Sequence, residues 1–180
     1  MLNETDLLTA ANRFQPEALI EIYDLYHAQL YAYAYRTLMD AALAEDCVAA
    51  SFERLITILH KGKGPTRNLR AYLYRIAHNW MMDGYRQDRR VQQVDDFEDI
   101  QWEAGGQTPP EALGARMVSV ELKTLLRELT PLQREVIILR FLDEFSLQET
   151  AAVLKKPVGA VKSLQNRALR TMRRRYEFKE

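Results

Sequence analysis

The sequence predicts an all-α fold in two parts joined by a flexible linker, and three observations support this prediction. Apolar residues recur at steps of three and four along several segments, which is the spacing of one helix face. Ser or Thr followed three residues later by Glu or Gln marks two helix starts. Helical patterning stops over residues 92–114, where paired glycines and paired prolines interrupt the chain, and no strand pattern of any length occurs.

Three amphipathic helices are expected before this break. Their apolar stripes run over residues 19–33, 47–59 and 69–85, and the third stripe is the most regular. Asn68 is a suitable N-cap for the third helix, because its side chain can accept a hydrogen bond from an unpaired backbone N–H. Residues 60–67 hold two glycines, a proline and three cations, so a basic loop is expected between the second and third helices.

Further helices are expected after the break. Residues 118–129 carry another apolar stripe. Residues 130–133 combine a Thr cap, a Pro at the first helical position and a Gln, and residues 146–149 form a capping box. The Lys-Lys-Pro sequence at 155–157 ends the helix that begins at Ser146, and a last helix is expected over residues 158–176.

Charge is segregated along the chain although the net charge is zero, with 25 basic and 25 acidic residues. Residues 1–59 carry 3 basic and 9 acidic residues (−6), and residues 60–94 carry 8 and 2 (+6). Residues 95–111 hold six acids and no base, and residues 112–180 carry 14 basic and 8 acidic residues (+6). This pattern predicts two surfaces that face polyanions, separated by an acidic linker at residues 92–114.

Several classes of protein are disfavoured by composition. A single cysteine, Cys47, cannot close an internal disulfide, and the three histidines lack the spacing of a zinc site. The first residues lack the basic segment of a signal peptide, and no apolar run reaches the ~20 residues that a membrane span needs. We therefore expect a cytoplasmic protein with no cofactor and no membrane insertion.

The last two predicted helices, separated by a tight turn, have the helix-turn-helix arrangement, in which the second helix enters the major groove of DNA. On a helical wheel Val161, Leu164, Ala168 and Met172 face inward. The opposite face carries Ser, Asn and Arg, which can bind phosphates and base edges. The candidate DNA-binding residues on this helix are Lys162, Ser163, Asn166, Arg167 and Arg170.

Residues 129–140, 146–151 and 158–163, with Arg167-Ala168, resemble the C-terminal promoter-binding domain of bacterial sigma factors of the sigma-70 family. The resemblance is greatest to the extracytoplasmic-function (ECF) group. It implies a region 4-like helix-turn-helix domain over residues 115–180, and it implies that the five candidate residues recognise the −35 promoter element.

The N-terminal part resembles the other half of the same family. Residues 44–46 and 52–54 resemble the sigma helix that binds the clamp of core RNA polymerase. This resemblance implies that four residues bind the polymerase: Asp46, Phe52, Glu53 and Arg54. Residues 69–79 with Asp83, Tyr85 and Arg86 resemble the helix that melts and reads the −10 element. Residues 1–91 would then form a region 2-like bundle. Its implied −10 contacts are Lys61, Lys63, Arg67, Arg75, His78, Asn79 and Arg86.

Strand opening needs a pocket for an unstacked base. We expect the loop at residues 61–67 and Asn79 to hold one base of the −10 strand together, because an amide can both donate and accept hydrogen bonds. Tyr72 and Trp80 lie on the apolar stripe and are expected in the core. Tyr74 lies off the stripe and is more open to a functional role.

Some positions depart from the family pattern. Ala49-Ala50 stands where the family has a polar Gln-Glu pair, which leaves fewer polar contacts for the clamp, and Lys155 stands where a turn glycine is usual. If residue 155 has positive φ, this substitution costs about 1 kcal/mol.

The leading interpretation is an ECF sigma factor that is not itself an enzyme. Its implied partners are core RNA polymerase, promoter DNA and an anti-sigma factor. The alternative is a stand-alone helix-turn-helix transcriptional regulator, but that class does not account for residues 15–90. A hydrolase or nuclease built on His27, His60 and His78 lacks catalytic spacing.

Overall fold

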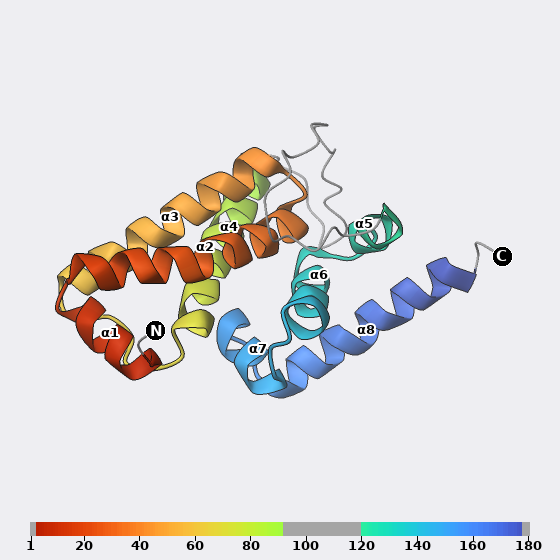
Figure 1. The fold of residues 1–180 in the computed structure, drawn as a ribbon. Coiled ribbons are helices and arrows are strands. Elements are labelled where there is room, and N and C mark those ends of the chain that lie inside the picture. Colours follow the sequence, from red (N-terminus) through yellow and green to blue (C-terminus); the bar gives the residue numbers. More distant parts are fainter. Residues whose placement is uncertain (1–2, 92–119, 178–180) are drawn as a thin grey trace.

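The computed structural model describes residues 3–91 and 120–177, and throughout these two ranges the secondary structure is helical with no β-strand (Figure 1). The predicted all-α fold class is therefore confirmed. The acidic linker predicted at residues 92–114 lies outside the described residues. No helix in the described part of the chain is both long enough and apolar enough to cross a membrane.

The N-terminal half is a bundle of four helices. Three of them correspond to the predicted stripes, and each extends beyond its stripe at one end or both. Asp40 caps the third helix by accepting a hydrogen bond from the Leu43 N–H at 2.9 Å. The helices are α1 (Glu4–Asn12), α2 (Pro16–Leu38), α3 (Ala41–His60) and α4 (Leu69–Val91).

Helix α1 was not predicted from the apolar pattern. Its N-cap is Asn3, whose side chain accepts a hydrogen bond from the Asp6 N–H at 2.9 Å. Leu7, Leu8 and Ala11 are buried against the bundle. An apolar stripe of three residues in nine is too short to stand out in the sequence, so packing rather than periodicity identifies this helix.

The C-terminal half follows the predicted order of helices. Ser146 and Glu149 form the expected capping box, with reciprocal hydrogen bonds of 3.1 and 2.8 Å, and the Thr130 N–H donates to Gln133 at 3.3 Å. A π-helical turn, η1, was not foreseen. The elements are α5 (Val120–Arg127), α6 (Pro131–Ile137), η1 (Ile138–Leu142), α7 (Leu147–Leu154) and α8 (Val158–Glu177).

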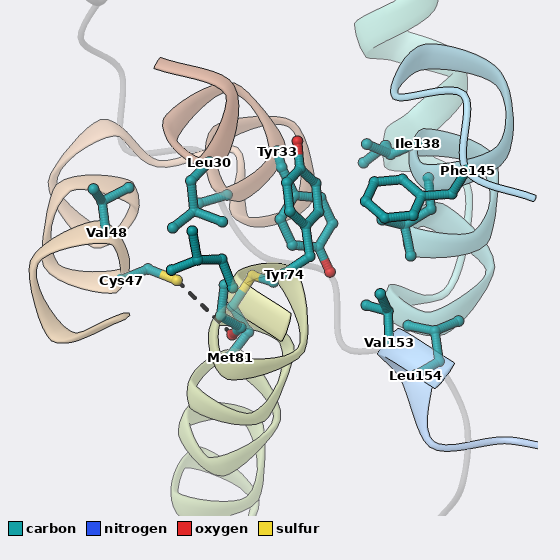
Figure 2. Close-up of a cluster of buried hydrophobic side chains, with 14 of the residues drawn as sticks. Leu30, Tyr33, Cys47, Val48, Tyr74, Met81, Ile138, Phe145, Val153 and Leu154 are labelled. Carbon is teal, nitrogen blue, oxygen red and sulfur yellow. Dashed lines mark hydrogen bonds between the residues drawn. The ribbon is translucent and has the colours of Figure 1, made fainter. Parts of the chain in front are cut away.

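The two halves share one continuous core. Figure 2 shows Tyr33 of α2 and Tyr74 of α4 facing Ile138 and Phe145 of the C-terminal half. The Tyr74 ring centroid lies 4.7 Å from that of Tyr33 and 4.8 Å from that of Phe145. Helix α7 lies beside α4 (Figure 1), so the linker joins two halves that are already in contact.

The packing between the two halves determines how far the Tyr74 side chain is buried. Its side chain is fully buried, because the C-terminal half covers the side of α4 that the apolar stripe leaves open. Tyr74 is therefore a core residue, contrary to the role that its off-stripe position suggested. Tyr72 and Trp80 are half-buried and pack at the edge of the core.

Candidate functional site

The helix-turn-helix consists of α7, a three-residue turn and α8. Lys155 ends α7 in the left-handed conformation, with φ of 52°, and its N–H donates to the Ala151 carbonyl. The Lys156 N–H donates to the same carbonyl at 3.0 Å. The turn thus adopts the backbone shape that usually needs glycine, at a cost of about 1 kcal/mol that its hydrogen bonds offset.

The polar face of α8 is open to solvent, whereas Val161 and Ala168 on the opposite side are fully buried. This inward packing confirms the helical wheel. The exposed residues include every predicted −35 contact, and together they form the recognition face: Lys162, Ser163, Asn166, Arg167 and Arg170.

Arg140 of η1 holds this helix in position, and the sequence did not indicate that role. Its Nε donates to Gln165 Oε1 at 3.3 Å, and its Nη1 donates to the Phe145 carbonyl. Arg140 therefore ties the π-helical turn both to the segment before α7 and to the buried edge of α8. A π-helical turn, which tends to occur at functional sites, here orients a side chain that supports the recognition face.

The basic loop between α3 and α4 is held by α1. Asn12 accepts a hydrogen bond from the Gly64 N–H at 2.8 Å and donates to the Pro65 carbonyl at 3.1 Å. A Cβ added at Gly64 would lie 2.3 Å from a Leu59 methyl carbon and 2.6 Å from Asn12 Oδ1, so a larger residue there would force these side chains to shift. The loop's predicted −10 contacts are all exposed: Lys61, Lys63 and Arg67.

The −10 candidates on α4 have unequal access to solvent. Arg75 and Asn79 are half-buried, and the Arg75 guanidinium lies 5.3 Å from the centroid of the Tyr72 ring. Arg86 is exposed and pairs with Asp83 at 3.2 Å. His78 is only 5% exposed, and its Nδ1 lies 3.0 Å from both oxygens of Glu135 in the C-terminal half. In this arrangement DNA cannot reach His78 unless the two halves separate.

A groove of about 930 Å³ runs between α3, α4 and the C-terminal half. It brings Asn79 and Arg86, predicted to bind DNA, together with Glu53 and Arg54, predicted to bind the polymerase. Lys155 and Lys156 of the turn line the other side of the groove. Residues from both predicted surfaces of the N-terminal half therefore meet at the junction with the C-terminal half.

The predicted polymerase-binding residues on α3 divide into exposed and buried. Asp46, Glu53 and Arg54 are exposed, and they carry both signs of charge. Phe52 is 7% exposed, and its ring centroid lies 4.9 Å from that of Tyr23 on α2. Phe52 therefore packs α3 onto α2 and positions its exposed neighbours.

Buried charges at the junction are the largest feature that sequence reasoning missed. The residues are Arg36, Arg134, Glu135 and Asp143, each less than 9% exposed. Arg134 and Glu135 directly precede the apolar residues 136–139, and no local pattern marks any of the four as buried, since charged residues are buried only when paired with groups that lie far away in sequence. Burial outweighs the attraction of Arg36 and Arg70 and raises the pKa of Asp143 to about 6.

Cys47 is a free, buried thiol. Burial raises the pKa of Cys47 to about 12, and its thiol lies 3.8 Å from the Ala77 carbonyl oxygen (Figure 2). Across residues 3–91 and 120–177 no three His, Cys, Asp or Glu side chains gather in a way that could hold a metal ion.

Both halves match families of known proteins. Residues 22–91 match sigma-70 region 2, and residues 125–174 match sigma-70 region 4. The chain is 31% identical over 169 residues to the ECF RNA polymerase sigma factor BldN of Streptomyces coelicolor, covering 94% of this chain and 64% of that protein. It is also 31% identical over 161 residues to the ECF RNA polymerase sigma factor SigX of Bacillus subtilis, covering 87% of this chain and 82% of SigX.

Solved structures have a similar fold. The sigma factor RpoE of Bartonella quintana, in complex with the anti-sigma factor NepR, matches with a TM-score of 0.68 and 26% identity, covering 86% of this chain and 93% of RpoE. CnrH, in complex with the cytosolic domain of CnrY, matches with a TM-score of 0.68 at 22% identity, covering 98% and 99% of the two chains. The second match supports the fold alone.

Proposed function

The chain belongs to the ECF RNA polymerase sigma factors, and on that premise we propose that it binds core RNA polymerase and directs promoter-specific initiation. It would supply promoter recognition to a catalytic partner without being an enzyme. The observation that carries this proposal is the open Ser, Asn and Arg face of α8, in a chain whose other half matches sigma-70 region 2. A stand-alone regulator is not favoured, because it has no use for that half.

The −35 element would be read by the recognition face of α8. Arg167 and Arg170 can each donate two hydrogen bonds to guanine, and Asn166 can pair with adenine. Lys162 and Ser163 lie near the start of the helix, where contact with phosphate fixes its register on the duplex. The anchoring of this helix by Arg140 supports the assignment, because base readout needs a fixed orientation.

Core polymerase would bind the exposed face of α3 through Asp46, Glu53 and Arg54. Phe52 contributes by holding α3 on α2 rather than by touching the partner. Ala49 and Ala50 lie between these contacts and offer a surface without polar groups, so charge at the two ends of the face would set the orientation of the polymerase.

The −10 element would be captured by the basic loop and α4. Lys61, Lys63 and Arg67 are placed to meet phosphates, and Asn79 in the adjacent groove would hydrogen-bond an extruded base. Arg75 and Arg86 flank this position, and His78 would join it after the halves separate.

Strand opening tests this assignment. Asn79→Ala should leave polymerase and −35 binding intact and slow formation of the open complex, and a template with a pre-melted −10 region should restore only part of the rate. Permanganate footprinting measures the melted thymines. Normal reactivity at a normal rate in the variant would exclude Asn79 from base capture.

An anti-sigma factor is the proposed regulatory partner, since RpoE of Bartonella quintana is bound by one. The groove between α3, α4 and the C-terminal half is the proposed place for it. A cytoplasmic location is proposed with it, as promoter DNA and polymerase require.

Run-off transcription with core polymerase and a promoter library tests the function as a whole. We expect transcripts only when the chain and core polymerase are both present, and co-purification of the two. A footprint on duplex promoter DNA by the chain alone, with no transcript from the mixture, would favour the regulator instead.

A further inference from the structure

The basic loop at residues 61–67 is attached at its middle to the first helix, α1. Asn12, the last residue of α1, is half-buried and accepts a hydrogen bond from the Gly64 N–H at 2.8 Å. Its amide donates to the Pro65 carbonyl at 3.1 Å and to the Leu8 carbonyl of its own helix at 2.9 Å. One side chain therefore joins α1 to two successive backbone groups of the loop.

The same N-terminal segment contacts both ends of the loop. Before the loop, the Phe14 ring packs against that of His60, the last residue of α3, with centroids 5.0 Å apart and an angle of 73° between the rings. After the loop, Glu4 Oε1 accepts a hydrogen bond at 2.9 Å from the N–H of Leu69, the first residue of α4. A carboxylate at a helix N-terminus is electrostatically favourable, so this contact stabilises the start of α4.

The second part of the loop depends on Asn12, because its own backbone does not hold it. The first part is closed by the Gly62 N–H, which donates to the Leu59 carbonyl at 2.8 Å. For residues 64–67, no hydrogen bond joins their backbone to another backbone group in the described part of the chain. Fixing a free backbone costs conformational entropy, so a loop that Asn12 already fixes binds a partner with a smaller entropic loss.

A fixed loop also discriminates between bases more strongly than a free one. The loop's exposed cations, Lys61, Lys63 and Arg67, can approach any phosphate, and phosphate contacts carry no preference for one base. A preference needs a surface that rejects the wrong base, whereas a free loop would adapt to several bases. Asn12 restrains the backbone directly after Lys63, so it would supply rigidity to the loop rather than a contact to DNA.

We propose that Asn12 is a positioning residue for −10 recognition: it fixes the loop at Gly64 and Pro65, and the fixed loop sets the preference for the captured base. The contact itself is independent of what the protein does. Its consequence rests on the proposed function, in which the loop at residues 61–67 and Asn79 hold one extruded base.

A promoter library with randomised −10 and −35 elements tests the proposal. Holoenzymes are reconstituted from core polymerase with wild type or Asn12→Ala, and the templates that form open complexes are sequenced. In the variant, the preference for one base at one −10 position should fall about 3- to 10-fold, because two hydrogen bonds to the loop are lost. The −35 preference and the affinity for core polymerase should stay unchanged. An unchanged −10 preference would overturn the proposal. Equal relaxation at −10 and −35 would also overturn it, since Asn12 would then only stabilise the fold.

Thr9→Ala is the matched control, because the Thr9 hydroxyl donates to the Thr5 carbonyl within α1 at 2.8 Å, as Asn12 does to Leu8. This variant should keep the −10 preference of wild type. A loss as large as that in Asn12→Ala would overturn the proposal, since the effect would then come from α1 as a whole.

Amide hydrogen exchange of the full chain tests the contact without DNA. The Gly64 N–H should exchange faster in Asn12→Ala than in wild type or Thr9→Ala, because its acceptor is removed. Equal exchange in all three proteins would overturn the positioning role. Failure of the proposed function would show separately, as absence of open complexes and transcripts from wild type and core polymerase while the difference in exchange remains.

Discussion

Helices α4 and α8 look alike in sequence and differ in their surroundings. Each has an apolar stripe on one side and cations on the other. On α8 the cationic side is exposed, whereas on α4 the residues Arg70, Tyr74 and His78 lie under the C-terminal half. The difference teaches that a polar helix face in a two-part protein can be an internal interface, provided that the other part supplies matching carboxylates.

The largest expected effect is a loss of stability, and it should be greater on the side of α4 that faces the C-terminal half than on the side at the edge of the core. Tyr74→Ala should lower the free energy of unfolding by about 3–5 kcal/mol, because it leaves a cavity between the halves. Tyr72→Ala is the matched control, and it should cost less than about 2 kcal/mol because Tyr72 is half-buried. Urea denaturation measures both. Equal losses would mean that the junction contributes no more than the edge of the core.

Acid should strengthen the junction through Asp143. Its pKa of about 6, against 3.8 for the ordinary carboxyl, means that the closed fold favours the protonated form. This contribution is complete below the unfolded pKa and disappears as pH rises through about 6, a change of up to about 3 kcal/mol. The gain in stability of Asp143→Asn over wild type should therefore grow as the pH of urea denaturation is raised from 4 to 7. If the difference in unfolding free energy between the variant and wild type did not change with pH, it would contradict the raised pKa of Asp143.

Substitutions on the exposed side of α8 are expected to lower DNA affinity and to leave the free energy of unfolding nearly unchanged. Arg167→Ala and Arg170→Ala should each leave unfolding within about 0.5 kcal/mol of wild type, because both side chains are exposed. If one of them reads a base, binding to −35 duplex DNA should weaken by about 1–3 kcal/mol at one base position.

A uniform loss across sequences, with a smaller dependence on salt, would instead assign that arginine to phosphate. Anisotropy titrations at several salt concentrations separate these outcomes. If neither variant binds more weakly, the recognition face is not where α8 meets DNA.

The smallest effect is expected on the exposed face of α3, which is open like that of α8. Asp46→Arg should weaken binding to core polymerase by about 1 kcal/mol or less, as is usual for a solvated charge. Asp24→Arg makes the same change on an exposed site of α2 and should have no effect. Competition with a labelled sigma factor measures both. Unaltered affinity of the Asp46 variant would remove this residue from the interface.

Local features of the chain were predictable because neighbours in sequence create them. Ser146 and Glu149 are three residues apart, so their capping box depends on no other part of the fold. The exposed side of α8 also follows from its own apolar stripe, of which Val161 and Ala168 are fully buried and the other members pack at the edge of the core. The fold class and the recognition face were therefore accessible without a structure.

Contacts between distant residues required the tertiary structure. Asn12 holds a loop 52 residues away, and its polarity gave no hint of this. Tyr33 and Glu135 are 102 residues apart, and each alone reads as an ordinary helix residue.

The sequence by itself determined the helices other than α1 and η1, the two capping motifs of the C-terminal half and the open face of α8, because these follow from the period of one helix and the hydrogen bonds of its ends. Only the tertiary structure shows that the C-terminal half covers a second side of α4, in addition to the side whose apolar stripe packs inside the N-terminal bundle. A charged residue can be buried at low cost only where its counter-charge arrives from another element. Asp143 meets Arg36 in that way, and no local pattern records which two elements will meet.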